Sequence, residues 1–94
     1  MILWDERKNL KLQLERKISF EEIAQIILGK EYIDILENPS RHNQKLFVIK
    51  FDEYIWAVPF LTDEKDNIIL KTAYPSRKLQ TKYGERYESS DKIR

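Results

Sequence analysis

The chain has 94 residues, of which 41% are hydrophobic and 35% are charged, and this length fits one domain with a two-layer core. It contains no cysteine and a single histidine, His42, which excludes a disulfide framework, a cysteine nucleophile and a histidine-clustered zinc site. No apolar run approaches the roughly 20 residues that cross a bilayer, and the segment after Met1 lacks the pattern of a signal peptide. We therefore expect a cytoplasmic protein that uses no metal and no other cofactor.

The net charge of +1 conceals a division of charge along the chain. Residues 1–18 hold five basic and three acidic side chains, residues 19–70 hold five and ten, and residues 71–94 hold seven and three. If the two positive ends meet in the fold, they form a basic face that attracts phosphates in a salt-dependent way. A highly charged surface also shows such fluctuations by chance, so both interpretations stay open.

The first segments of the chain have helical patterns. Residues 2–4 are a brief apolar start for a short strand, and Asp5 can cap a helix that runs to about Lys17. Leu10 and Leu14 share one face of this helix, because residues four apart are neighbours on a helical surface.

A stronger signal follows in Ser19-Phe20-Glu21-Glu22, which is a capping box. Ile18 and Ile23 fit a hydrophobic staple around it, and Gly29 is a natural residue for the end of a helix. These features predict a helix over residues 20–28.

The remaining pattern alternates with a period of two, which is typical of strands. We expect strands over residues 32–36, 45–51, 54–61 and 68–74, with Pro59 marking a bulge or a sheet edge. Their short connections predict an antiparallel meander. Ser76 can cap a short helix from Arg77 to Tyr83, closed by Gly84.

The predicted fold class is α+β, with two N-terminal helices on an antiparallel sheet of about four strands and a short C-terminal helix. We expect one domain over residues 1–84 and a polar tail over residues 85–94.

Three segments carry a family resemblance. The start Leu3-Trp4-Asp5 with Lys8-Asn9, the helix start Ile18-Ser19-Phe20-Glu21-Glu22, and Thr72-Ala73-Tyr74-Pro75-Ser76-Arg77-Lys78 after the last strand occur in matching order and spacing. With them the chain resembles the BrnT-like toxins of the RelE/ParE superfamily of type II toxin–antitoxin pairs. Arg16-Lys17 stands where that family often has His-Gly.

This resemblance implies a RelE-like fold and a ribonuclease that inhibits translation by cutting RNA, either free mRNA or mRNA on the ribosome. It also implies a small DNA-binding antitoxin as partner, and binding of operator DNA through the complex. RNA cleavage without metal needs cations that stabilise the phosphorane and groups that move protons.

Candidate residues for this chemistry follow from residue type and position. Arg77 is the first candidate for a phosphate clamp, since its planar fork bonds two phosphate oxygens. Lys78 can support it, Tyr83 can stack on a base or share a proton, and His42 can act as acid or base. Further RNA contacts are expected from Lys8, Lys17, Arg41 and Lys71. We expect the cations of the two ends to converge on one concave patch over the sheet.

Other interpretations remain open at this point. The same basic face could hold RNA or a protein without cutting, or the chain could be a structural subunit of a heteromer, because one fold hosts several functions. The aromatic side chains Tyr54, Trp56, Phe60 and Tyr74 either fill the core or contact a partner.

Overall fold

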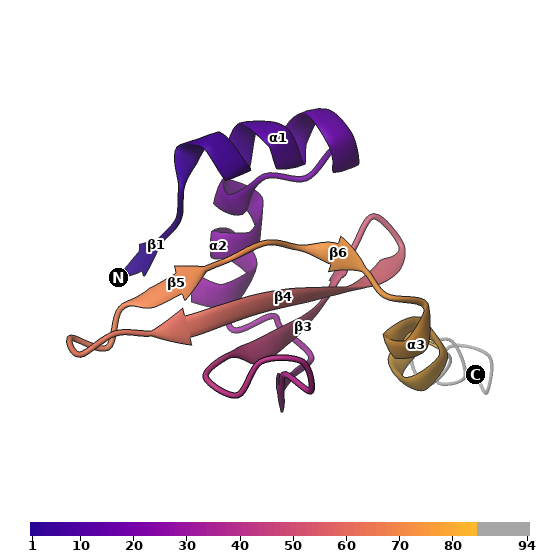
Figure 1. Cartoon of the computed structure of the whole chain (residues 1–94). Helices are drawn as coiled ribbons and strands as arrows, with labels where there is room; N and C mark the ends of the chain where they lie inside the picture. The colour runs from indigo at the N-terminus through magenta and orange to yellow at the C-terminus, as the bar shows by residue number, and fades with distance from the viewer. Residues whose placement is uncertain (85–94) are drawn as a thin grey trace.

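A computed structural model describes residues 1–84 of the chain, and the predicted polar tail, residues 85–94, lies outside this described part. The α+β class is confirmed, with the helical layer preceding most of the sheet in the chain (Figure 1). The elements are β1 (Ile2–Leu3), α1 (Glu6–Arg16), α2 (Phe20–Leu28), β2 (Asp34–Glu37), β3 (Lys45–Phe51), β4 (Tyr54–Thr62), β5 (Ile68–Leu70), β6 (Tyr74–Pro75), α3 (Arg77–Leu79) and the π-helical turn η1 (Gln80–Gly84).

The predicted caps of the two N-terminal helices are confirmed. The carboxylate of Asp5 accepts hydrogen bonds from the amides of Arg7 at 2.8 Å and Lys8 at 3.4 Å, so it satisfies donors of the first turn of α1. At α2, Ser19 Oγ accepts the Glu22 amide at 3.1 Å, and Glu22 Oε1 accepts the Ser19 amide at 2.9 Å. Both helices therefore begin where the sequence places them.

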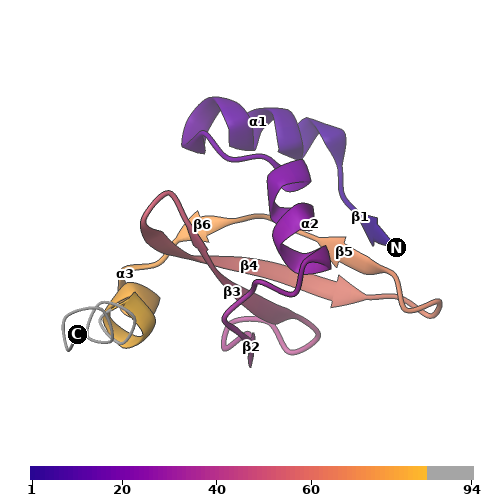
Figure 2. The same cartoon turned by 180° about the vertical axis from the view of Figure 1, so that it is seen from behind.

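Asn9 of α1 is a buried polar side chain that the sequence patterns do not single out as structural, with 1% of its surface exposed. Its Oδ1 accepts the Phe20 amide at 2.8 Å, and its Nδ2 donates to Glu21 Oε1 at 2.8 Å and Glu6 Oε1 at 3.3 Å. The hydrogen bond from Asn9 is the main cause that lowers the pKa of Glu21. Asn9 thus ties α1 to the start of α2, and the two helices meet at that end of α2 in Figures 1 and 2.

The strands form one sheet in the order β1-β5-β4-β3-β2, with β6 pairing separately with β4. The predicted meander from β2 to β5 is antiparallel, as expected. The sheet as a whole is mixed, however, because β1 pairs in parallel with β5 and places Ile2 opposite Ile68. The sheet has more strands than the expected four or so, because the short strand expected at residues 2–4 joins it as β1 and the strand expected over residues 68–74 is divided into β5 and β6.

The expected last strand over residues 68–74 is divided by a bulge. Leu70 pairs with Phe60, but Tyr74 pairs with Ala57. The chain from Leu70 to Tyr74 therefore holds one residue more than the stretch of β4 that it faces. Pro59 lies opposite this irregularity and has no amide hydrogen to donate, while its carbonyl accepts the Lys71 amide at 2.9 Å. The expected bulge or edge at Pro59 is thus a bulge.

Hydrophobic side chains fill both faces of the central strands β3 and β4. The larger cluster lies under α1 and α2 and includes Phe20, Ile49, Trp56 and Phe60. The smaller cluster lies on the opposite face, where Leu79 and Tyr83 of the C-terminal helical segment pack on Leu46, Val48, Ile55 and Ala57.

Two helix ends differ from expectation. Gly29 keeps a φ of −79°, and the left-handed residue that follows α2 is Lys30, with φ 55°. The predicted helix from Arg77 to Tyr83 is α-helical only to Leu79 and continues as the π-helical turn η1. In residues 1–84, no helix is both long and apolar enough to cross a membrane.

Candidate nucleic-acid interface

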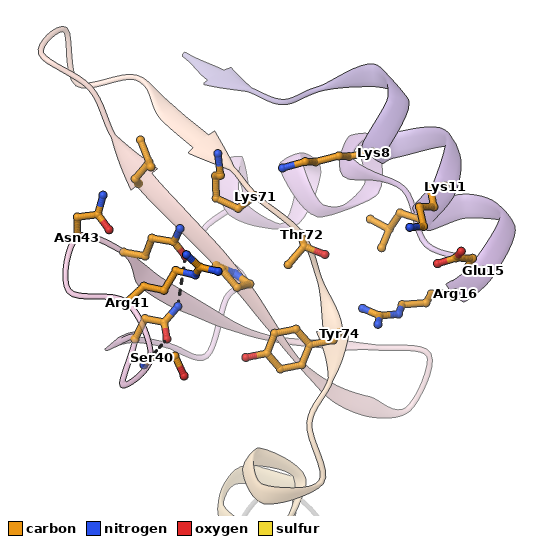
Figure 3. A pocket seen from close by; sticks show the side chains of 15 residues that line it. Lys8, Lys11, Glu15, Arg16, Ser40, Arg41, Asn43, Lys71, Thr72 and Tyr74 are labelled. Atoms are coloured by element: carbon orange, nitrogen blue, oxygen red, sulfur yellow. Dashed lines mark hydrogen bonds between the residues drawn. The ribbon is translucent and has the colours of Figure 1, made fainter.

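A groove with a volume of about 860 Å³ opens where α1, the loop between β2 and β3, and the segment after β5 meet (Figure 3). These three parts are far apart in the sequence, and each contributes at least one cation. The groove is lined by Lys8, Lys11, Leu12, Glu15, Arg16, Asn38, Ser40, Arg41, Asn43, Gln44, Pro59, Leu61, Lys71, Thr72 and Tyr74.

One wall of the groove is a single face of α1. Lys8, Lys11 and Glu15 project from it at helical spacings of three, four and seven residues, and Arg16 follows at the end of the helix. The guanidinium of Arg16 donates a hydrogen bond to the carbonyl of Ala73 in the segment between β5 and β6. This bond ties the end of α1 to the bulge, so the wall and the floor are held together.

The facing wall is the loop between β2 and β3, and it carries Arg41 (Figure 3). The loop is braced internally, because the amides of Asn38 and Gln44 donate to the carbonyls of Gln44 and Arg41, each at 3.2 Å. The Asn38 side chain adds bonds to Gln44 Oε1 at 3.3 Å and from the Ser40 amide at 3.0 Å. The backbone that carries Arg41 is therefore positioned before any ligand arrives.

The floor is made by β4 and by the bulge opposite it. Pro59 and Leu61 supply apolar surface, and the bulge brings Lys71 and Tyr74 into the groove. Tyr74 has 36% of its surface exposed, and its ring lies between Arg41 and Arg16 in Figure 3. A single irregularity in the ladder thus places both a cation and an aromatic ring at the site.

The electrostatics of the groove are one-sided. Five basic side chains line it, those of Lys8, Lys11, Arg16, Arg41 and Lys71, against one acidic side chain, that of Glu15. Within residues 1–84, none of these five cations lies within ion-pair distance of a carboxylate, and the pair that does form is Lys50–Glu53, at 3.9 Å. Neighbouring unpaired cations repel one another, so the groove favours an anion with several charges.

The structure brings together three of the residues that we expected to contact RNA, Lys8, Arg41 and Lys71. Lys17 does not line the groove, and it ends α1 in a left-handed conformation with φ 60°. The convergence of cations therefore involves the N-terminal helix, the central loop and the segment after β5, rather than the two ends of the chain alone.

The four residues proposed for catalysis do not line the groove. Arg77 and Lys78 are exposed on α3, which begins beyond the Tyr74 end of the groove (Figure 3). Ser76 Oγ accepts the Leu79 amide at 3.2 Å, so that amide of the short helix is already occupied. His42 is exposed in the loop beside Arg41. Their catalytic roles stay predictions.

Tyr83 lies in a different environment from the one that its expected role requires. It is 5% exposed, packs in the smaller cluster, and donates from Oη to Asp34 Oδ2 at 2.8 Å. An aromatic ring buried against the sheet offers no face to an RNA base. The expectation that Tyr83 stacks on RNA is therefore corrected: its ring completes the core on that face.

Three groove residues were missed as candidates, Lys11, Arg16 and Tyr74. Lys11 follows Lys8 at a helical spacing of three residues, and Tyr74 is one of four aromatic side chains that the sequence pattern leaves open between the core and a partner contact. Of those aromatics, Trp56 and Phe60 are buried in the larger cluster and Tyr54 is half-buried against it. Of the four aromatic side chains, Tyr74 therefore lines the groove, and the other three belong to the larger cluster or pack against it.

Comparison of the chain with protein-family models, with curated proteins and with solved structures finds no match. The function is therefore inferred from the chemistry of the groove and from the resemblance of its sequence motifs.

Proposed function

We propose that this protein is a metal-independent endoribonuclease of the toxin class, which binds RNA in the basic groove. The observation that carries the proposal is the convergence on one groove of five cations from three distant segments, none of which forms an ion pair with a carboxylate of residues 1–84. RNA presents one phosphate per nucleotide, and a row of cations binds it with release of counterions. The motifs shared with BrnT-like toxins support the same class of substrate.

The cleavage proposed here is an internal transesterification. The 2′-oxygen loses its proton and attacks the adjacent phosphorus, the bond from phosphorus to the 5′-oxygen breaks, and that oxygen takes up a proton. The products are a 2′,3′-cyclic phosphate and a 5′-hydroxyl. Arg41 is the first candidate to stabilise the phosphorane, because its guanidinium makes no hydrogen bond within residues 1–84, whereas that of Arg16 uses part of its donors on the Ala73 carbonyl and keeps the others for a second phosphate.

One observation favours a second candidate function, RNA binding without cleavage. The side chains of His42 and Arg77, which were expected to move protons and hold the scissile phosphate, do not line the groove. The groove itself offers the Tyr74 hydroxyl and three lysines for proton transfer, and these groups are ordinary components of a binding surface as well.

The deciding experiment incubates the purified full chain with a labelled RNA in EDTA. A nuclease of the proposed type yields fragments that end in a 2′,3′-cyclic phosphate, and its expression arrests bacterial growth. Lys65→Gln is a matched control for Lys8→Gln, because both remove one charge and Lys65 is exposed on the hairpin between β4 and β5, outside the groove lining. We expect Lys8→Gln to slow cleavage and Lys65→Gln to leave it unchanged.

The outcomes separate the two candidates. Cleavage that depends on Lys8 supports the nuclease. Binding that depends on Lys8 without any cleavage supports the RNA-binding module. Absence of both contradicts the assignment of RNA to the groove.

A toxin of this kind would be neutralised by a small DNA-binding antitoxin, and one surface supports the presence of a protein partner. Leu10 and Leu14 lie one turn apart on the outer side of α1 and are 60% and 80% exposed. Exposed leucines at helical spacing are common in helix interfaces. Co-expression with the product of the neighbouring gene, followed by co-purification and a growth assay, tests this proposal.

A further inference from the structure

The groove combines two kinds of surface, and their arrangement has a consequence for the form of RNA that it takes. Cations stand on both walls, with Arg16 on α1 and Arg41 on the opposite loop. Between them lies the ring of Tyr74 (Figure 3), and Pro59 and Leu61 also line the groove. A surface of this type suits a flat apolar group that is flanked by charges.

We propose that Tyr74 is a stacking platform for one unpaired base, and that the groove selects single-stranded RNA with Arg16 and Arg41 holding the phosphates on either side of that base. This inference rests on the proposed function and names the form of its substrate. Aromatic rings bind bases by their π-faces with little dependence on sequence. In a duplex the faces of the bases are already covered by their neighbours, so these bases cannot stack on the Tyr74 ring.

The position of Tyr74 is fixed by the sheet rather than by a flexible loop. Its backbone pairs with Ala57 of β4, and the neighbouring Ala73 carbonyl accepts the hydrogen bond from Arg16. The backbone that carries the ring is therefore held on one side by the ladder and on the other by the end of α1. A platform that is already ordered loses little conformational entropy when a base stacks on it.

The preference between single-stranded and double-stranded RNA distinguishes binding by charge alone from binding that depends on base stacking. A duplex carries a higher charge density than a single strand, so a groove that acted by charge alone would bind the duplex more tightly. A groove that depends on stacking prefers the single strand. The direction of the preference thus separates the two explanations without any variant.

The test uses the purified full chain with a ten-nucleotide RNA that contains 2-aminopurine, whose fluorescence falls when the base stacks. Cleavage is prevented by replacing the 2′-hydroxyls with 2′-O-methyl groups. We expect the wild type to bind the single strand more tightly than a duplex of the same sequence and to quench the fluorescence on binding.

Two variants isolate the ring from the hydroxyl. Tyr74→Phe keeps the ring and should keep both affinity and quenching, whereas Tyr74→Leu should lose about tenfold in affinity and most of the quenching. A thermal melt like that of the wild type shows that each variant is folded.

Each result is decisive for one of the two proposals. If the wild type binds RNA but prefers the duplex, shows no quenching, or responds equally in Tyr74→Leu, the stacking platform is refuted and the proposed function stands. If the wild type binds no RNA, the proposed function itself fails and the platform fails with it.

Discussion

Tyr83 Oη donates a hydrogen bond to Asp34 Oδ2 at 2.8 Å, across 49 residues of sequence. The bond joins the C-terminal turn η1 to the strand β2 at the edge of the sheet. The Tyr83 ring belongs to the smaller hydrophobic cluster, on the face of the sheet away from α1 and α2. This bond is the largest cause that holds the pKa of Asp34 below its usual value. Tyr83, which the sequence suggests as a contact to RNA, thus stabilises the fold by linking η1 to β2.

Removing the Tyr83 hydroxyl should destabilise the protein in a pH-dependent way. The folded-state pKa of Asp34 lies below the ordinary value of 3.8, so the bond stabilises the native state above that pH and this contribution disappears as the pH falls through the folded-state pKa. Tyr83→Phe should therefore melt below the wild type at pH 7, and the gap should narrow near pH 3. Thermal unfolding followed by circular dichroism measures both.

Asp34→Asn provides the matched comparison, because it removes the titrating group and keeps the size of the side chain. The double variant with Tyr83→Phe should show no further change with pH at this site. A gap between wild type and Tyr83→Phe that stays constant from pH 7 to pH 3 would contradict the assignment.

Loss of the Asn9 side chain should be costly. Asn9→Ala leaves the Phe20 amide at the start of α2 without its acceptor in a site that is buried from water. The expected destabilisation is about 2 kcal/mol, the cost of a buried unsatisfied donor. Urea unfolding measures it. Gln25→Ala on the exposed side of α2 is the control, and its expected change is within about 0.5 kcal/mol.

Binding of single-stranded RNA should weaken with salt in proportion to the phosphates that the groove neutralises. Each phosphate contact contributes about 0.7 to the slope of log affinity against log salt. Lys71→Gln should reduce the slope by roughly that amount and weaken all sequences alike, since Lys71 lines the groove. Fluorescence titrations at several salt concentrations give the slope, and an unchanged slope in Lys71→Gln would place the RNA elsewhere.

A comparison of two arginines tests where the scissile phosphate lies. Arg41 lines the groove, whereas Arg77 lies on α3 outside the lining. If the groove holds the phosphate, Arg41→Ala should lower the cleavage rate by about a hundredfold or more, in the range seen when one stabilising donor is removed. Arg77→Ala should lower it less. The reverse order would move the reaction centre towards α3.

The local part of this fold was predictable because its signals lie within a few residues. Asp5, the Ser19–Glu22 capping box and the alternating strands from β2 to β4 are each specified by neighbours in sequence, through amides that need acceptors and side chains that alternate between faces. Pro59 was informative as well, since a residue without an amide hydrogen cannot donate to a neighbouring strand, although its pairing with Leu46 of β3 is kept. These elements appear within two residues of where the sequence predicts them.

The site itself was decided by tertiary structure. Lys8, Arg41 and Lys71 could be proposed as cations from the sequence, but nothing local states that α1, a loop and a bulge share one groove, or that Arg16 and Tyr74 join them. The burial of Tyr83 beside Asp34 depends in the same way on two segments that are distant in the chain. Residue type and local periodicity determine elements, whereas the packing of remote elements determines which side chains face a ligand.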